Sequence, residues 1–475
     1  MTKTLNILDT TLREGEIHPG ISYSTNERKE IGLDLVELGT PRIEFPLLSL
    51  GRGAKLTDIT SATKEIEESS NSIAIIQCRS LKSDIESAQQ YEVKGCAVYL
   101  AVSEIQRKNK LNEISIEETI NRLTESMTLL KECGFKYRRA VLEDVSKFFS
   151  AYKGKEDTIE NFTKLIKAVN ETEATIISLP DTFGALTPEQ SIKMFKTARQ
   201  LTKKELAGHF HNDYGRALTN SIAVIEQELI DEIQVSIYGL GARNGIPDHY
   251  EISVYCLDDL NIDIGENRDS FWKTYHNFEK ITKIPIPWRH PLKAIRESAG
   301  THIKQQLKNK EGYIPKKKLL HDFNEQEIIH EAGKYLSKQQ IQILIGSLVD
   351  EKTVIRITNK IAGYAQLRGK NILPIEVRDL IQKDTGIKLS IEDVSKVIYG
   401  SNFGFLILKL DPKTPARVMV DDISSWEGVE WITQIYGSID MLIACQLKIN
   451  EENTLEKVKK KYRKWIQSTE EWFAE

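Results

Sequence analysis

Two short segments carry side chains whose types and spacing suit metal-assisted chemistry. His209 and His211 are separated by one residue, and on a β-strand alternate side chains project to the same face. Two imidazoles on one face, with an open position beside them, suit a divalent catalytic metal; a pair of structural histidines at a strand end is the alternative. Arg13 and Glu14 add a cation that could polarise a carbonyl and an anion that could hold the metal, although such pairs also occur as surface charges.

These segments need a scaffold that brings them together. Short β-branched runs alternate with amphipathic stretches, and this predicts βαβ units around a parallel sheet. About eight units in roughly 260 residues favour a closed (β/α)8 TIM barrel, with an open doubly wound sheet as the alternative; the carboxyl ends of barrel strands converge on one site. The predicted strands are residues 5–8, 42–45, 72–76, 97–101, 140–142, 175–179, 205–209 and 232–237, with helices at 26–38, 116–133 and 158–169 among the stretches between them.

Beyond the predicted barrel the pattern changes twice. Alternation stops near Ser270, and prolines between residues 284 and 291 indicate a linker. We expect a TIM-barrel catalytic domain at 1–265, a linker and helical subdomain completing the acyl-CoA site at 266–400, and a ferredoxin-like α+β module at 401–475. The predicted helices are 325–336, 338–348 and 374–384; the module's predicted order is strand 403–410, helix 414–423, strands 429–435 and 439–447, and helix 454–466.

Composition excludes several classes of protein. The 475 residues carry 65 Lys plus Arg against 69 Asp plus Glu, and a net charge of −4 gives no electrostatic reason to expect nucleic acid or an anionic membrane as a partner. Five widely spaced cysteines without a CxxC pair indicate reduced thiols. No apolar run reaches the roughly 18 residues that span a bilayer, and no signal-peptide pattern opens the chain. We expect a soluble, cytoplasmic protein.

Several motifs together resemble the DRE-TIM metallolyase superfamily. They are most similar to its Claisen-condensing branch of homocitrate, 2-isopropylmalate and citramalate synthases, over about residues 1–320. The resemblance implies a metal-dependent acyltransferase that condenses acetyl-CoA with a 2-oxo acid and then hydrolyses the thioester. The motifs are Arg13-Glu14-Gly15-Glu16, Glu143-Asp144, Asp181-Thr182-Phe183-Gly184, His209-Phe210-His211-Asn212-Asp213 and Gly239-Leu240-Gly241-Ala242-Arg243-Asn244.

The resemblance assigns roles in the barrel. Glu14, His209 and His211 would hold a divalent metal cation (Zn, Mn or Mg), which the 2-oxo acid would chelate. Arg13 would stabilise the negative charge that develops on the keto oxygen. Thr182 would hydrogen-bond the carboxylate of the substrate.

A second part of the resemblance lies beyond the barrel. The segment Ser298-Ala299-Gly300-Thr301-His302-Ile303-Lys304 is similar to the Lys-Ala-Gly-Ile-His-Ala-Lys segment of the condensing enzymes, and Tyr313 follows at the matching distance. By resemblance, His302 with Glu143 and Tyr313 would remove a proton from the acetyl-CoA methyl group. A neutral imidazole suits general-base work near pH 7.

The side chains at the positions that would select the 2-oxo acid favour different substrates. Leu81, beyond Arg79, stands where homocitrate synthases have a histidine, and because leucine cannot hydrogen-bond it favours a smaller or apolar keto acid. Lys147 stands where those enzymes place an arginine that meets the distal carboxylate. Glu14 and Asn244-Gly245-Ile246 are typical of homocitrate synthases. We expect homocitrate synthesis from 2-oxoglutarate in lysine biosynthesis, with 2-isopropylmalate, citramalate or Re-type citrate synthesis as alternatives.

The C-terminal module resembles the RAM-type ligand-binding module of Lrp-like regulators, with Tyr436-Gly437-Ser438-Ile439-Asp440 as its turn. This implies a homodimer or higher homo-oligomer with an amino-acid effector, or a module used only for dimerisation. Two rival functions remain. One is aldol cleavage of the HMG-CoA-lyase type. The other is a catalytically silent amino-acid sensor, which departures from the family pattern at Ile17, Ala242 and Glu297 would fit.

Overall fold

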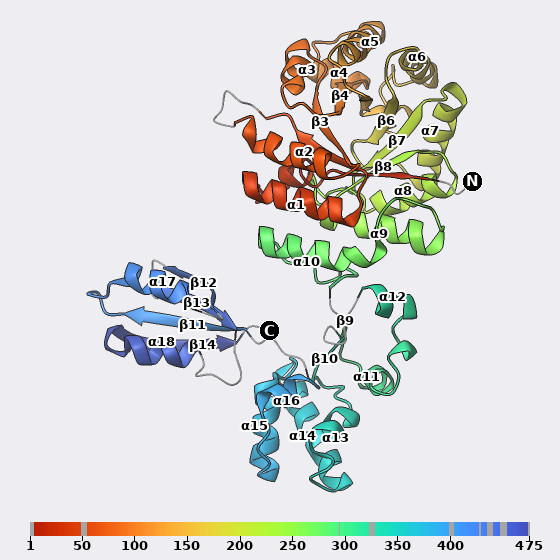
Figure 1. Cartoon of the computed structure of the whole chain (residues 1–475). Helices are drawn as coiled ribbons and strands as arrows, with labels where there is room; N and C mark the ends of the chain where they lie inside the picture. Colours follow the sequence, from red (N-terminus) through yellow and green to blue (C-terminus); the bar gives the residue numbers. More distant parts are fainter. Residues whose placement is uncertain are drawn as a thin grey trace. The chain divides into compact units, whose positions relative to one another are not determined.

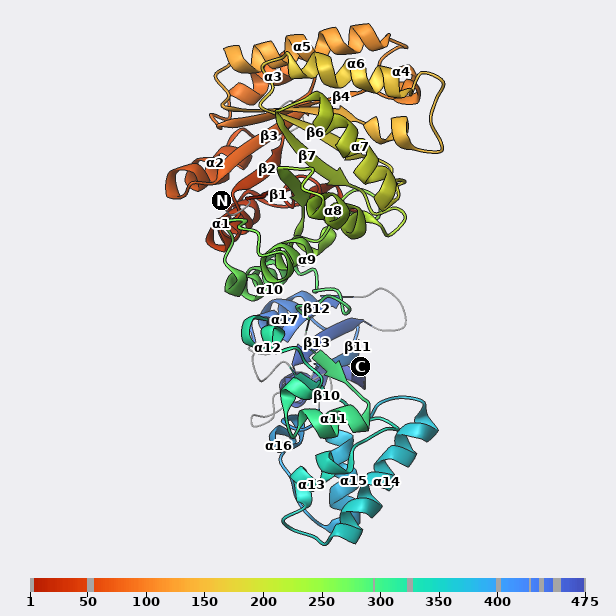
Figure 2. The same ribbon diagram turned by 90° about the vertical axis from the view of Figure 1, so that its right-hand side faces the viewer.

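The structure is a computed structural model that describes residues 4–48, 55–293, 295–322, 328–398, 403–426, 429–434, 440–446 and 454–473. Its contacts divide the chain into two compact units, Met1–Lys293 and Ala294–Glu475. Most elements of both units are labelled in Figure 1, and Figure 2 gives a second view of each. The finer division at residues 265 and 400 stays a prediction.

Eight parallel strands close into a barrel in the first unit, which confirms the predicted fold class. Each strand pairs with the next in chain order, and β8 pairs with β1, so that Asn6 lies opposite Glu232. All eight strands coincide with predicted ones to within a few residues. They are β1 (Asn6–Asp9), β2 (Arg42–Pro46), β3 (Ile73–Arg79), β4 (Gly95–Ala101), β5 (Tyr137–Glu143), β6 (Ile176–Asp181), β7 (Glu205–Phe210) and β8 (Glu232–Val235).

Helices surround the barrel, and neighbours such as α5 and α6 lie side by side in both views (Figures 1 and 2). Capping residues mark where some of these helices begin. Ser24 and Glu27 form a capping box at the N-terminus of α1, and Thr187 and Gln190 form one at the N-terminus of α7. The helices are α1 (Thr25–Leu38), α2 (Thr57–Ser69), α3 (Lys82–Gln89), α4 (Glu104–Lys110), α5 (Ile116–Glu132), α6 (Ile159–Asn170), α7 (Pro188–Leu201), α8 (Ala217–Glu226), α9 (His249–Val254) and α10 (Phe271–Thr282).

The barrel interior combines a small apolar cluster with a buried ionic one. Leu8, Ile75 and Val141 belong to the apolar cluster. Beside it, the Arg139 guanidinium lies between the carboxylates of Glu44 on β2 and Glu232 on β8, and all three side chains are fully buried. Arg139 lies on β5. Because buried charges are stable only when paired, β2, β5 and β8 must keep their relative register.

The second unit begins with a two-stranded parallel sheet, β9 (Ile295–Glu297) and β10 (Ile328–His330), and continues with helices around their own apolar cluster. The prediction of a helix at 325–336 is wrong for residues 328–336. Residues 328–330 form a strand because this short β-branched run finds a strand partner, and residues 331–336 form bridges and turns; residues 323–327 lie outside the described part. The helices are α11 (Gly300–Gln306), α12 (Lys316–His321), α13 (Lys338–Ile345), α14 (Glu351–Arg368), α15 (Pro374–Thr385) and α16 (Ile391–Ser395).

The end of the chain forms a ferredoxin-like sheet, as predicted. Its strand order is β12-β13-β11-β14, and Leu408, Met419 and Val458 belong to one apolar cluster formed by the sheet and both helices. The last strand was not predicted, and the predicted helix at 454–466 ends early, at Tyr462. Residues 435–439 of the predicted turn lie outside the described part. The elements are β11 (Phe403–Leu410), α17 (Ala416–Ser424), β12 (Val429–Gln434), β13 (Met441–Gln446), α18 (Thr454–Tyr462) and β14 (Ile466–Phe473).

No helix within the described ranges is long and apolar enough to cross a bilayer.

A buried imidazole joins the end of β1 to the segment after α9. His249 Nδ1 lies 2.8 Å from Asp9 Oδ2, and its Nε2 lies 2.7 Å from Glu266 Oε1. Burial opposes a charge on this ring, but Glu266 and Asp9 outweigh it and raise the pKa of His249 to about 10. Asp9 also accepts a hydrogen bond from the Thr11 amide at 2.8 Å, so the protonated ring holds the turn that leads to Arg13.

We expect the stability of the first unit to fall as pH rises above about 6.5, because the unfolded chain then loses a proton that His249 keeps in the folded chain. A raised pKa stabilises the fold fully below about pH 6.5, the ordinary value, and this contribution is lost as pH rises towards 10, by about 1.4 kcal/mol per pH unit. The melting temperature of the wild type should therefore drop between pH 6.5 and 9.5, and that of His249→Gln should be lower at pH 6.5 and change less. His276→Gln, which alters a half-buried ring stacked on Trp272, is the control. Equal slopes in all three proteins would contradict the assignment.

Candidate active site

Three buried side chains at the carboxyl ends of the barrel strands could hold a metal ion. Ligand atoms of Glu14, His209 and His211 all lie within 4.8 Å of one another. The two Nε2 atoms are 3.2 Å apart, and His209 Nε2 is 4.0 Å from Glu14 Oε1. Two nitrogens bound to one tetrahedral ion at about 2.1 Å would lie roughly 3.4 Å apart, so the spacing fits a shared ion.

The protonation states of this cluster suit metal binding. Burial would raise the pKa of Glu14, but Arg13 and the two imidazoles lower it to about 2. Burial, with His211 beside it, lowers the pKa of His209 to about 3, and burial lowers that of His211 as well. Near neutral pH the cluster therefore presents one carboxylate and two neutral imidazoles, which are the forms that coordinate a cation.

The orientation of His209 is set by a neighbouring strand. Its Nδ1 lies 2.9 Å from Gln234 Oε1 on β8, and the Gln234 amide nitrogen lies 3.4 Å from Ser178 Oγ on β6. An amide oxygen can only accept, so Nδ1 carries the proton and Nε2 keeps its lone pair for a ligand. His211 Nδ1 is buried and has no hydrogen-bond partner among the described residues.

Arg13 is held from two sides beside this cluster. Its Nε donates to Glu44, and one of its terminal nitrogens donates to Glu14 Oε1 at 2.7 Å. Glu44 in turn binds Arg139, so the ionic cluster of the barrel interior continues up to the candidate site. The guanidinium is about nine-tenths buried and cannot swing into solvent.

The loop after β8 closes over Glu14. The Ala242 amide lies 3.3 Å from Glu14 Oε2, and the Gly245 carbonyl accepts from the Asn212 amide at 2.9 Å. Gly245 has φ +83°, and a Cβ there would lie 2.0 Å from the Gly239 carbonyl oxygen, so only glycine fits. Ala242 acts on Glu14 through its backbone, whereas Asn244 is exposed within the same loop.

The loop after β6 brings Thr182 to the same end of the barrel. Gly184 has φ +59°, and a Cβ there would lie 2.5 Å from the His211 carbonyl oxygen, so the two loops touch. The Asp144 amide donates to Thr182 Oγ1 at 2.9 Å, which leaves the hydroxyl proton free to be donated elsewhere. Arg243 ties the loops further: it donates to the Thr182 carbonyl at 2.5 Å and to the Asp213 carboxylate at 2.7 and 2.9 Å.

The end of β5 and the residues after it carry one cation and two carboxylates. The Lys147 ammonium lies 4.8 Å from the centre of the Phe183 ring, and among the described residues no carboxylate forms an ion pair with it. Glu143 pairs with Lys110. Burial raises the pKa of Asp144 to about 7, against the Ser103 hydroxyl and the charge of Lys147, which lower it.

Two predicted substrate-binding residues, Arg79 and Leu81, are not linked to the candidate metal cluster by any contact among the residues that the structure describes. Arg79 donates to both oxygens of Asp84, at 2.7 and 3.0 Å, and its side chain is 62 % exposed. Leu81 precedes α3 and is 44 % exposed. Within the described part of the chain, no hydrogen bond or ion pair joins either residue to the Glu14, His209 and His211 cluster.

His302 and Tyr313 belong to the second unit. Their rings stack at a centroid distance of 4.2 Å and an angle of 26°. His302 Nδ1 lies 2.8 Å from Glu297 Oε2, and Glu297 Oε1 accepts from the Ser298 and Ala299 amides at 3.0 and 2.8 Å.

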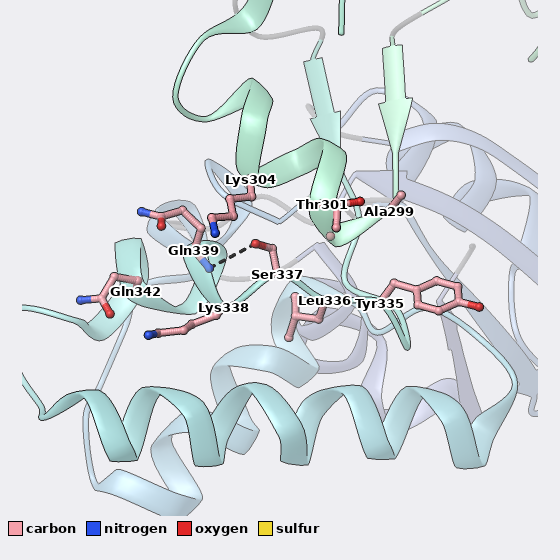
Figure 3. Close-up of a pocket in the computed structure, with 10 residues that line it drawn as sticks. Ala299, Thr301, Lys304, Tyr335, Leu336, Ser337, Lys338, Gln339 and Gln342 are labelled. Atoms are coloured by element: carbon pink, nitrogen blue, oxygen red, sulfur yellow. Dashed lines mark hydrogen bonds between the residues drawn. The ribbon is translucent and has the colours of Figure 1, made fainter. Parts of the chain in front are cut away.

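A pocket of about 630 Å³ opens beside the same segment of the second unit (Figure 3). Ser337 Oγ, the N-cap of α13, accepts from the Gln339 amide at 3.2 Å within it. The lining holds two lysines and no acidic side chain, so the pocket is positively charged; Lys338 is already paired with Glu351. None of the predicted site residues lines it. The lining residues are Ala299, Gly300, Thr301, Lys304, Tyr335, Leu336, Ser337, Lys338, Gln339 and Gln342.

The sequence analysis missed three residues that hold the predicted ones in place. Glu44 and Gln234 are polar residues inside short apolar strands, and that contrast is a signal of an inward-facing functional side chain. Glu297 was noted only as a departure from the family pattern. Its position five residues before His302 gives no indication that the two side chains meet.

A closed (β/α)8 barrel with a carboxylate and two imidazoles at the carboxyl ends of its strands defines a barrel enzyme with a candidate metal site. The HMGL-like family matches residues 4–284, more than half of the chain, so the chain belongs to this family. This confirms the predicted superfamily.

Comparisons with individual proteins agree with this assignment. Homocitrate synthase of Saccharolobus islandicus is 26% identical over 458 residues, which cover 94% of each chain. The probable 2-isopropylmalate synthase of Ignicoccus hospitalis is 27% identical over 393 residues, 81% of this chain and 93% of that one. Among solved structures, an HMG-CoA lyase of Bacillus subtilis shares the fold with a TM-score of 0.52 and 22% identity, over 60% of this chain and 96% of that one.

We expect the cluster to bind one divalent cation per chain. Titration calorimetry with Zn²⁺, Mn²⁺ and Mg²⁺ on chelator-treated protein would measure the affinity. His209→Ala and His211→Ala should each weaken binding more than about 100-fold, since loss of a ligand costs more than loss of its outer hydrogen-bond partner. His276→Gln should bind like the wild type. Unchanged affinity in both alanine variants would place any bound metal elsewhere.

Proposed function

We propose that the chain is an acyl-CoA C-acyltransferase that condenses acetyl-CoA with a 2-oxo acid. The observation that carries the proposal is the cluster of Glu14, His209 and His211 with the Arg13 guanidinium fixed beside it. The homocitrate and 2-isopropylmalate synthases among its relatives support the same reaction class.

In this proposal the barrel side chains prepare the electrophile. A divalent cation held by the cluster (Zn, Mn or Mg) would supply Lewis-acid polarisation of the keto group. Arg13 offsets the negative charge that builds on the keto oxygen, and it does so without reorganising because Glu14 and Glu44 already hold it. The Thr182 hydroxyl group donates a hydrogen bond to the carboxylate of the 2-oxo acid.

The proton of the acetyl methyl group goes to a base that the second unit supplies. We assign this role to His302, with Tyr313 stacked against it and Glu143 as a further acidic group. A half-exposed imidazole remains open to an incoming substrate, unlike the buried rings of the barrel cluster. The methyl carbon then bonds to the keto carbon, and the keto oxygen takes up a proton to become a hydroxyl group. Water finally cleaves the thioester to a carboxylate and releases coenzyme A.

We propose 2-oxoglutarate as the 2-oxo acid, and therefore homocitrate synthesis. Lys147 is the supporting observation: it stands near Thr182 and carries a positive charge that no described carboxylate neutralises within ion-pair distance. A second carboxylate on the substrate would supply that partner. Leu81 is exposed and makes no polar contact, so it does not provide the histidine-like hydrogen bond of the homocitrate synthase pattern. Asn244, exposed in the loop that caps Glu14, would complete the site.

The C-terminal module would serve regulation in this proposal. Its βαββαβ order supports a RAM-type module at residues 401–475 that binds an amino-acid effector, lysine for a homocitrate synthase, and joins two chains into a homodimer or larger assembly. The barrel at 1–265 and the helical subdomain at 266–400 would then form the catalytic part.

We expect thiol release from acetyl-CoA, with a divalent metal added, when the chain is offered the right 2-oxo acid. The panel is 2-oxoglutarate, 2-oxoisovalerate, pyruvate and oxaloacetate. Preference for 2-oxoglutarate would support homocitrate synthesis, and preference for another acid would support the corresponding synthase. No release with any acid would overturn the proposed function in favour of an HMG-CoA-lyase-type cleavage or a silent sensor.

We expect Lys147→Met to act on one substrate only. It should lower kcat/KM for 2-oxoglutarate by about 10- to 100-fold, mostly through KM, because a charge-assisted contact to the distal carboxylate is lost. Residual turnover of pyruvate, which has no distal carboxylate, should stay within about twofold. Lys164→Met, which removes an exposed lysine on α6, is the control. Equal losses for both acids would remove Lys147 from substrate recognition.

A further inference from the structure

The ring of His302 is fixed at one nitrogen and open at the other. Its Nδ1 faces the Glu297 carboxylate at 2.8 Å. Among the described residues no hydrogen bond occupies Nε2, and 41 % of the side chain is exposed. A carboxylate can only accept a hydrogen bond, so Nδ1 carries the proton and Nε2 holds the lone pair.

Glu297 is itself held in place. Its Oε1 accepts from the backbone amides of Ser298 and Ala299, at 3.0 and 2.8 Å, while Oε2 faces His302. Its strand, β9, pairs with β10, and the Glu331 amide donates to the Glu297 carbonyl at 2.9 Å. The backbone and the side chain of Glu297 are therefore both held by contacts other than the one with His302.

Tyr313 fixes the remaining freedom of the ring. Its phenol stacks on His302 at 4.2 Å with an angle of 26° between the planes. The hydrogen bond sets the direction of the imidazole, and the stacked ring sets its tilt. An unsupported surface histidine would have neither restraint.

We propose that Glu297 is a positioning residue that turns His302 into an oriented base, forming a carboxylate–imidazole pair within the second unit. The proposal rests on the function proposed above, in which His302 accepts the proton of the acetyl methyl group. When Nε2 takes that proton, the electron pair of the C–H bond stays on the methyl carbon as the nucleophile. The imidazolium that results is stabilised by the Glu297 carboxylate without any rearrangement.

The same pairing explains the departure from the family pattern. Glu297 is one of the departures from the family pattern that would fit a catalytically silent sensor. In the structure the new side chain contacts the histidine that is retained. The departure therefore supports catalysis here and weakens the case for a silent sensor.

Other charged groups near the pair define the controls. Glu331, which directly follows β10, pairs with Arg296, and among the described residues no hydrogen bond or ion pair joins it to His302, so Glu331→Gln removes a carboxylate next to the same small sheet. His330, the last residue of β10, contacts Gln306 Oε1 through Nε2 at 2.9 Å; burial lowers the pKa of His330, while the Glu297 carboxylate acts in the opposite direction. Its imidazole signals must therefore be assigned separately.

The first test determines which ring nitrogen of His302 carries the proton, and it does not require the protein to be active. Imidazole ¹⁵N spectra of the full chain, with His302 assigned by its loss in His302→Gln and His330 by its loss in His330→Gln, should show the Nδ1–H tautomer in the wild type and in Glu331→Gln. Glu297→Ala should give a mixture of tautomers. Glu297→Gln keeps an oxygen that can accept from Nδ1 and should keep the tautomer. An Nε2–H tautomer in the wild type would overturn the proposal.

The second test separates charge from orientation by kinetics. With the 2-oxo acid that the panel selects, Glu297→Gln should lower kcat about tenfold and Glu297→Ala about 100-fold or more, with both KM values within about twofold of the wild type. Glu331→Gln should retain wild-type kcat. If both Glu297 variants fold and match Glu331→Gln, the proposal is wrong. If the wild type turns over no acid, the proposed function fails, while the tautomer of His302 still decides whether the pair exists.

Discussion

The Glu44 carboxylate is the connection on which the barrel and its site both depend. One of its oxygens faces Arg139 in the barrel interior, and the other faces Arg13 beside the candidate metal ligands. Because Glu44 is fully buried, neither arginine can be lost without leaving an uncompensated charge in a region of low dielectric constant. The strand register that keeps the barrel closed is therefore also the register that orients Arg13. Stability and catalytic orientation are achieved by the same ion pairs.

The loops at the carboxyl ends of the strands are held in place by contacts that start from Arg13. Arg13 holds Glu14, the loop after β8 closes over Glu14 through the Ala242 amide, and the loops after β6 and β7 touch at Gly184. The close approaches at Gly184 and Gly245 leave no room for a side chain, so these loops have little freedom to move apart. An arrangement prepared in this way costs little reorganisation when charge develops on a substrate.

The sequence predicted what depends on local pattern and missed what depends on distant contacts. The eight barrel strands follow from short β-branched runs that alternate with amphipathic stretches, and the pairing of His209 with His211 on one face follows from their spacing. β10 was mistaken for a helix because a short apolar run has no diagnostic period, and β14 was missed because its alternation is mostly polar, as an edge strand allows. The role of Glu44 requires the relative register of β1, β2 and β5, which no single segment encodes. The contact between Glu297 and His302 depends likewise on the turn between β9 and α11.

Three imidazole environments in one chain show how position decides chemistry. His249 lies between two buried carboxylates, which raise its pKa to about 10, so it is a permanent cation that holds β1 in place. For His209 burial is the main influence, with the neighbouring His211 acting in the same direction, and its pKa falls to about 3, so it stays neutral and free to bind a cation. His302 is half-exposed, with one carboxylate at Nδ1 and an open Nε2. This third arrangement leaves one ring nitrogen accessible to an incoming molecule, whereas the other two rings are buried. The surroundings of each ring thus suit a structural cation, a candidate metal ligand and the proposed base.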